Sequence, residues 1–152
     1  MSSFEVETIG KPEKWLIEAA ANIGLDYSGL THEITNHFKN HVVNRHGQGA
    51  LAIHEKDFEK IQSIVNAPDM AIIGAFRKGD LFNAYVKRIN RETYLYFDEV
   101  LDSNRNKALR SRTFYKIVKE LDMEGFEKIV TMNEKSDISK AKKYSSRRPS
   151  RL

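Results

Sequence analysis

Four short runs between residues 69 and 118 have the period and the residue types of β-strands, and short polar segments separate them. Alternating side chains or a high content of aromatic and β-branched residues is typical of strands. The connections are too short for parallel crossovers, which need a dozen or more residues. The pattern therefore predicts a four-stranded antiparallel meander, with strands at 69–76, 82–89, 93–101 and 110–118.

The chain before residue 69 has helical periodicity instead. Helices are expected at 12–23, at 31–47 with Thr31 as the N-cap, and at 55–65. Because helices come first and strands follow, the fold class is α+β, with N-terminal helices packed against the meander. The segment after Leu121 forms either a final helix or a fifth strand.

The length of 152 residues suits one domain. We divide it into a leader and first helix (1–30), a core (31–134) and a basic tail (135–152). The tail carries seven Lys and Arg residues and one acidic residue, whereas the preceding chain carries 18 basic and 20 acidic residues. We expect the tail, through Lys143 and Arg147, to bind phosphates. A solvated end or a partner-binding arm is the alternative.

Several classes of protein are disfavoured by what the sequence lacks. There is no cysteine, so a disulfide framework or a thiolate metal site is excluded. No apolar run approaches the length that spans a bilayer, and the N-terminus does not resemble a signal peptide. Phosphate-loop and dinucleotide-binding glycine motifs are absent. We expect a protein without a membrane anchor that works in the cytoplasm.

Four of the five histidines lie in one segment, at His32, His37, His41 and His46. On a helix, His37 and His41 share a face, and Arg45 follows at the same spacing. His46 stands at the helix end, where a side chain can project into a neighbouring cleft. Histidine is the usual general acid or base near neutral pH. The alternative is a solvated helix surface without a chemical role.

A metal site is a second interpretation of the same histidines. His37 and His41 have the spacing of a zinc pair, and His46 could join them. However, His32 and Glu33 do not begin an H-E-x-x-H motif, and a further ligand would have to come from elsewhere. We therefore expect no metal and no cofactor.

The strands offer hydroxyl groups and cations. Alternation places Tyr85 with Lys87 and Thr113 with Tyr115, and it turns Arg112 to the opposite face from Thr113. Lys, Thr and Tyr can stabilise a phosphorane and donate to its oxygens, which is what metal-free phosphodiester cleavage requires. The alternatives are a solvent-facing sheet surface or a platform for stacking bases.

The segment from Ile34 to Lys116 resembles the barnase–EndoU–colicin–RelE superfamily of nucleases. It is most similar to the phage and polymorphic-toxin branches, which include contact-dependent inhibition toxins. The resemblance rests on the order and spacing of short motifs: HVVNRHG, EKDFEKIQSIVNAPDMAIIG, NAYVKRI, TYLYFDEVL and LRSRTFYKI.

This resemblance implies a metal-independent endoribonuclease. The ribose 2′-hydroxyl would attack the adjacent phosphate and leave a 2′,3′-cyclic phosphate, and transfer RNA is a frequent substrate in the toxin branches. The family's helix histidine falls on His46, with His41 as the fallback. Its strand lysine falls on Lys87, and its last-strand hydroxyls fall on Thr113 and Tyr115. The expected substrate contacts are Arg45, Arg112, Tyr85, Lys143 and Arg147.

A toxic nuclease has to be neutralised in its producer. We therefore expect a cognate acidic immunity or antitoxin protein, complementary to Lys87 and the basic tail. Action in the cytoplasm of a target cell is expected, and delivery as the C-terminal part of a larger secreted protein is one route. The alternatives are a non-catalytic RNA-binding or phage-associated module on the same fold, and a metal-dependent nuclease that uses the histidine cluster.

Overall fold

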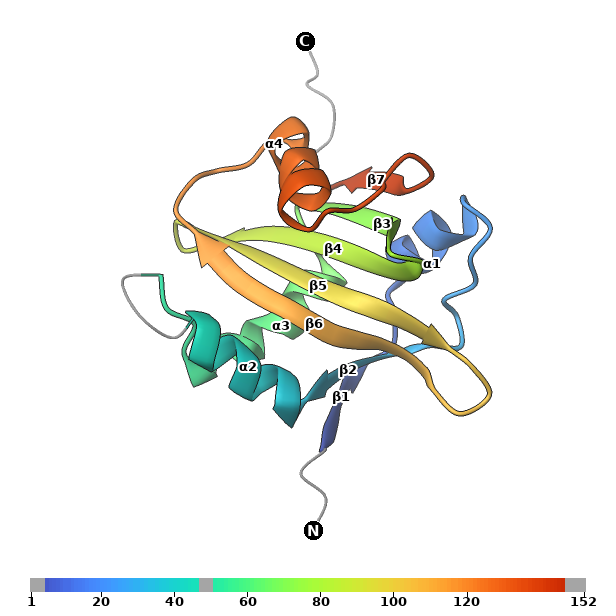
Figure 1. Cartoon of the computed structure of the whole chain (residues 1–152), viewed down its shortest axis with the longest axis horizontal. Coiled ribbons are helices and arrows are strands. Elements are labelled where there is room, and N and C mark those ends of the chain that lie inside the picture. The colour runs from blue at the N-terminus through green and yellow to red at the C-terminus, as the bar shows by residue number, and fades with distance from the viewer. Residues whose placement is uncertain (1–4, 47–50, 147–152) are drawn as a thin grey trace.

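In the part of the chain that the structure describes, a seven-stranded mixed sheet forms the centre of the molecule (Figure 1). The computed structural model describes residues 5–46 and 51–146, without the side chain of His46. The strands follow the spatial order β1-β2-β6-β5-β4-β3-β7. Their bounds are Val6–Gly10 (β1), Thr31–Thr35 (β2), Met70–Arg77 (β3), Asp80–Ile89 (β4), Glu92–Asp102 (β5), Lys107–Ile117 (β6) and Lys142–Ser145 (β7).

The four strands of the predicted meander are present, but the expected four- or five-stranded antiparallel sheet is wrong, because they lie within a seven-stranded mixed sheet in the described part of the chain. β3, β4, β5 and β6 pair antiparallel in sequence order. The β3–β4 turn contains Lys78 and Gly79, and the β4–β5 turn contains Asn90 and Arg91, all four with positive φ. Two-residue turns of this hand match the twist of the flanking strands, which is why they set the register of a hairpin.

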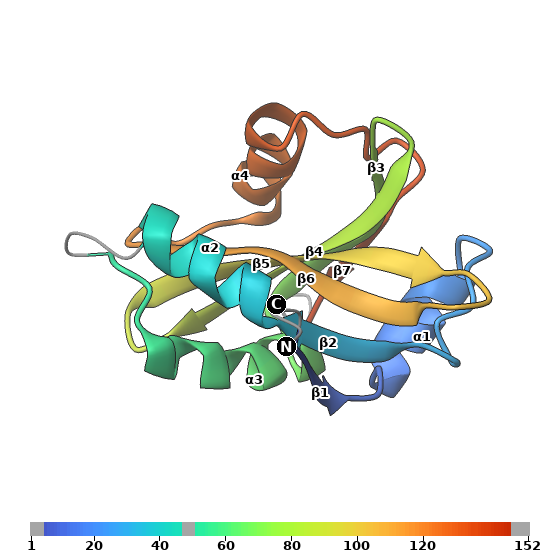
Figure 2. The same cartoon turned by 60° about the horizontal axis from the view of Figure 1, so that its bottom comes forward.

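Helices cover both faces of the sheet (Figure 2). α1 (Lys14–Ala21), the 3₁₀ helix η1 (Glu55–Lys60) and α3 (Ile61–Asn66) lie on one face, which we call the lower face. α4 (Met123–Lys128) and the π-helical turn η2 (Ile129–Asn133) lie on the other, the upper face. The helices predicted at 12–23 and 55–65 are confirmed in place, and of the two alternatives after Leu121 the helix is correct. Every helix in the described chain is too short or too polar to cross a lipid bilayer.

Each face of the sheet has its own hydrophobic core. Tyr85 and Tyr96 point to the lower core, which includes the buried residues of α1, η1 and α3. Their neighbours Ala84 and Phe97 point to the upper core with Phe126 of α4. Strict alternation along β4 and β5 therefore decides which side chains can reach each face.

The second predicted helix begins five residues later than expected. Residues 31–35 form β2, which pairs antiparallel with β1 and parallel with β6. His32 and Ile34 alternate inward, so sheet pairing outweighs the helical pattern. α2 (Asn36–His46) follows, and the Oγ1 of Thr35 accepts a hydrogen bond of 3.0 Å from the amide of Phe38. Thr35, and not Thr31, is the residue that caps this helix.

Both ends of the chain contribute strands that the sequence did not predict. The expected leader contains β1, and the expected solvated tail contains β7, which pairs with β3. Ile138 and Ala141 pack against the upper core. Residues 135–146 are therefore part of the folded body. Within them, the short strand β7 covers the edge of β3 that would otherwise be open.

Candidate active site

A cleft of about 510 Å³ lies where α2, β6 and the segment after η2 meet. Four predicted site residues line it together: His41 and Arg45 from α2, and Thr113 and Tyr115 from β6. The remaining lining residues are Val42, Arg77, Asn133, Glu134 and Lys135. The cleft thus combines a histidine, several cations and two hydroxyl groups.

The packing of α2 aims its histidine and arginine at the cleft. Phe38 and Val42 are buried in the lower core, which fixes the rotation of the helix against β6. His41 and Arg45 are exposed and one turn apart, so they project from the same side of the helix. Both side chains are free to approach a ligand that enters from solvent.

A β-bulge in β6 brings Arg112 to the same face as Thr113. Thr113 pairs with Phe97, whereas Ser111 pairs with the next residue, Asp98, so Arg112 is the extra residue. Its guanidinium Cζ lies 5.4 Å from the ring centroid of Phe82 in the upper core. The expectation that Arg112 turns to the opposite face is wrong, because the bulge breaks the alternation.

An adjoining pocket of about 370 Å³ extends the cleft along β6 and shares His41 with it. Glu99 and Arg110 line this pocket, and sequence reasoning missed both. Arg110 Nη2 lies 3.0 Å from Glu33 Oε1 of β2. Glu99 and Phe97 are two residues apart on β5, so they point to the same face of the sheet. Glu99 could therefore have been predicted as a site residue if the cleft had been known to lie on the upper face. The complete lining is Thr35, His37, Phe38, His41, Glu99, Arg110, Ser111 and Arg112.

Lys87 and Tyr85 do not join the cleft. Their shared face of β4 is the lower one, where Tyr85 is fully buried and its hydroxyl donates to Asp98 Oδ2 at 2.9 Å. Lys87 Nζ donates to the carbonyl oxygen of Ala67 at 2.6 Å. The sheet separates both side chains from Thr113 and Tyr115.

Three further predicted residues are not placed at the cleft. The side chain of His46 and all of Arg147 lie outside the described residues. Lys143 belongs to β7 at the far edge of the sheet, with its Nζ 2.8 Å from Glu127 Oε1. Among the side chains that the structure describes, no three histidine or carboxylate groups come together in a way that could hold a metal ion.

Tyr115 is a hydroxyl donor that stays protonated. Burial and then the nearby charge of Glu134 raise the pKa of its phenol well above the usual value. A phenol that keeps its proton can donate a hydrogen bond to a phosphate oxygen at any physiological pH. Tyr115 therefore contributes a donor to the cleft and not an additional charge.

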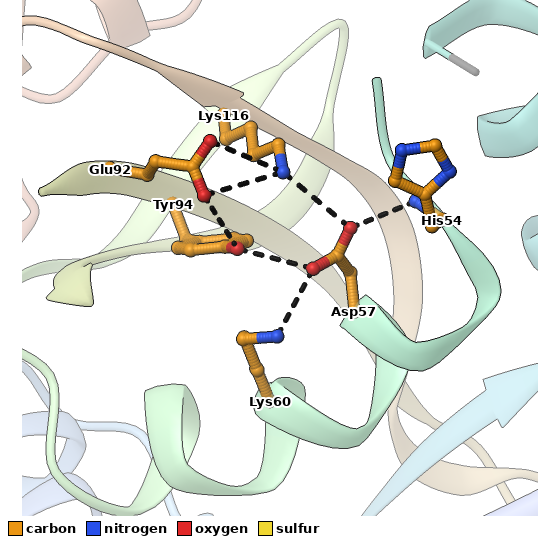
Figure 3. A network of polar contacts seen from close by, with 6 residues as sticks. All are labelled: His54, Asp57, Lys60, Glu92, Tyr94 and Lys116. Carbon is orange, nitrogen blue, oxygen red and sulfur yellow. Dashed lines mark hydrogen bonds and ion pairs between the residues drawn. The ribbon is translucent and has the colours of Figure 1, made fainter. Parts of the chain in front are cut away.

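A charged cluster lies on the lower face (Figure 3). None of its residues lines the cleft. Asp57 lies 3.7 Å from Lys116 Nζ and 3.1 Å from Lys60 Nζ, and it accepts hydrogen bonds from the His54 amide and the Tyr94 hydroxyl. These contacts satisfy a nearly inaccessible carboxylate and tie η1 to β5 and β6. We assign the cluster to the stability of the fold.

A second buried group of polar side chains lies on the lower face, with members on β2, β4 and β5. Asp98 accepts hydrogen bonds from Asn83 Nδ2 at 2.8 Å and from Tyr85 at 2.9 Å. Burial raises the pKa of Asp98 to about 7. His32 lies with Nδ1 3.8 Å from Asp98 Oδ2, and burial lowers its pKa to about 4.

Comparison with known proteins gives one match that covers most of the chain. The family described as phage-Barnase-EndoU-ColicinE5/D-RelE like nuclease3 matches residues 10–123. The chain belongs to this nuclease family. The match includes α2, β6 and the whole meander, and it ends at the start of α4. No curated protein and no solved structure matches the chain.

Proposed function

We propose that the protein is a metal-independent endoribonuclease that cleaves RNA at the cleft between α2 and β6. The observation that carries the proposal is the meeting of His41 and Arg45 with Thr113 and Tyr115, in a chain that belongs to a nuclease family. The groups are those that bind a phosphodiester directly, namely guanidinium and hydroxyl donors.

The reaction proposed is attack of the ribose 2′-hydroxyl on the adjacent phosphorus. The bond from phosphorus to the 2′-oxygen forms as the bond to the 5′-oxygen breaks, which leaves a 2′,3′-cyclic phosphate and a 5′-hydroxyl. Arg45 and Arg112 stabilise the charge on the phosphorane, and Thr113 and Tyr115 donate to its non-bridging oxygens. The proposal differs from the sequence-based one in leaving out Lys87, which lies on the other face.

Two proton transfers accompany this reaction, one from the 2′-hydroxyl and one to the leaving oxygen. His41 borders both pockets and is proposed as one of the two proton carriers. Glu99 lines the adjoining pocket and is the carboxylate available there for the other transfer. His46 remains a candidate for the same role.

Purified protein incubated with total cellular RNA, with and without EDTA, tests the proposal. We expect cleavage that EDTA does not abolish, with cyclic phosphate at the new 3′ ends. His41→Ala should lower kcat/KM by about 100-fold or more, the usual contribution of a proton carrier. Asn44→Ala is the matched control, because Asn44 is on another side of α2 and lines a different pocket.

Other outcomes of this experiment favour the alternatives. Activity that EDTA abolishes supports a metal-dependent nuclease, and RNA binding without any cleavage supports a binding module. Loss of cleavage in folded Lys87→Ala protein would move the site to the lower face.

We further propose that the nuclease acts as a toxin on transfer RNA in the cytoplasm of a target cell, and that an acidic immunity protein neutralises it. Arg45, Arg77 and Lys135 line the cleft and would complement such a partner. Mapping the ends produced in total RNA identifies the substrate. Growth arrest on expression of the wild type, absent for His41→Ala, tests the toxin role.

A further inference from the structure

An ion pair closes the side of the cleft opposite α2. Arg77 is the last residue of β3, and its Nη1 lies 3.9 Å from Oε1 of Glu134, which follows η2. Glu134 lies beyond residues 10–123, which are the part of the chain that matches the nuclease family. The carboxylate is therefore supplied to the cleft by the segment that follows the matched residues.

The backbone holds Glu134 in place. On its C-terminal side, Asp137 and Phe76 exchange two backbone hydrogen bonds of 2.8 and 3.0 Å, which attach the segment to the end of β3. On its N-terminal side, Ile129 packs against the upper core. The side chain of Glu134 is 17% exposed, so its position is fixed and partly shielded from water.

Arg77 and Glu134 attract each other through their charges, but they do not form a close hydrogen bond. A charge-assisted hydrogen bond between a guanidinium and a carboxylate is about 2.7–2.9 Å long, well below the 3.9 Å observed. The Glu134 charge also contributes to the raised pKa of Tyr115, so the carboxylate acts on two groups that face the cleft. The carboxylate therefore lies close to a cation and to a phenol that both line the cleft.

We propose that Arg77 is a further phosphate-binding residue of the cleft, and that Glu134 is its resting counter-ion, which a phosphate of the RNA displaces. The inference rests on the proposed function for the identity of the ligand. Glu134 is a positioning residue, because it acts through Arg77. In the free protein the Glu134 carboxylate reduces the attraction of the cleft for anions, because a phosphate must compete with the carboxylate for Arg77.

The test is the affinity for a 2′-O-methyl oligoribonucleotide, which cannot form the cyclic phosphate and is therefore not cleaved. Glu134→Gln should bind it about fivefold more tightly than wild type, the factor that corresponds to roughly 1 kcal/mol for a partly exposed ion pair. Glu124→Gln is the matched control, since it changes the net charge equally from an exposed site on α4. Fluorescence anisotropy at one fixed salt concentration measures both.

Two double variants show whether Glu134 acts through Arg77. The gain from Glu134→Gln should fall from about fivefold to about twofold or less in an Arg77→Gln background, where only direct repulsion between the carboxylate and the phosphate is removed, whereas the full gain should persist in a Lys107→Gln background, because Lys107 pairs with Asp102 at an exposed site. A purely structural role of Glu134 would not depend on Arg77. Glu134→Ala repeats the measurement if Glu134→Gln does not fold.

Failure of this inference can be told apart from failure of the proposed function. If wild-type protein cleaves RNA and Glu134→Gln binds no more tightly than Glu124→Gln, the inference is overturned and the ribonuclease proposal stands. If no RNA is cleaved, titration with inorganic phosphate becomes the readout. A gain for Glu134→Gln that requires Arg77 then supports the inference, and equal affinities overturn it.

Discussion

The buried pair of His32 and Asp98 leads to a prediction about how stability depends on pH. In the folded protein the pKa of Asp98 is about 7 and that of His32 is about 4, because burial disfavours both charged forms. Between about pH 4.5 and 6.5 the folded pair therefore holds one proton, on Asp98. The unfolded chain also holds one proton there, on histidine. Equal proton binding in the two states gives no pH dependence.

The two single variants make proton binding by the folded and unfolded states unequal, and they do so in opposite directions. Asp98→Asn leaves a histidine that is neutral when folded and charged when unfolded. Stability then falls as pH decreases from about 6.5 to 4, by about 3 kcal/mol in total at about 1.4 kcal/mol per pH unit. His32→Leu leaves a carboxyl group that is protonated when folded and ionised when unfolded. Stability then falls as pH increases from about 4 to 7, by about 4 kcal/mol.

Urea unfolding followed by circular dichroism at several pH values measures these slopes. The double variant His32→Leu/Asp98→Asn is the reference, because subtracting its free energy of unfolding removes the contribution of all other groups. Wild type minus the double variant should be flat over the same range. Slopes of the same sign for the two single variants, or two flat curves, would refute the reasoning.

Three further predictions concern stability and are measured in the same way. Gly74→Ala should cost about 1–2 kcal/mol, because its φ of +82° strains a side chain and the terminal methyl of Ile23, 2.5 Å from the new Cβ, has to turn away, whereas Gly79→Ala, with a similar φ and open space, should cost about 1 kcal/mol. Asp57→Ala should cost about 2–3 kcal/mol, because the His54 amide and the Tyr94 hydroxyl lose an acceptor and the buried Lys116 keeps only its contact with Glu92, whereas Asp102→Ala, from an exposed pair, should cost less than about 0.5 kcal/mol. Tyr144→Ala should cost about 1–2 kcal/mol and change the fluorescence of the single tryptophan, on which the ring stacks at 4.3 Å.

The sequence predicted those elements whose signal is local. The meander is readable because each strand carries its own alternation or its own run of apolar, aromatic and β-branched residues, and each turn its own polar residues. The three added strands were not, since β1, β2 and β7 are stabilised by partners far away in the chain. Residues 31–35 show how long-range pairing overrides a local helix signal. Thr31 is a good N-cap by residue type, but its segment pairs with β6 as a strand, and the helix begins only at Asn36.

The candidate site was predicted in part for the same reason. Thr113 and Tyr115 share a face through simple alternation, and His41 and Arg45 share one through helical spacing. Which face of the sheet Lys87 occupies relative to Thr113 depends on the register between strands, and no single strand reveals it. Arg112 required knowledge of the bulge, whose cause lies in the pairing with β5.

The parallel contact between β2 and β6 has a consequence for the order of folding. The amide of Thr35 meets the Ser111 hydroxyl across 76 residues, whereas β3 to β6 pair with their neighbours in sequence. Loop closure over such a distance is slow compared with hairpin formation, so we expect the meander to form early and β2 to dock late. Because α2 follows β2 directly, the histidine side of the cleft is completed only at that late step. A partly folded chain would therefore carry the hydroxyl groups without the histidine, and the proposed mechanism predicts that it is inactive as a nuclease.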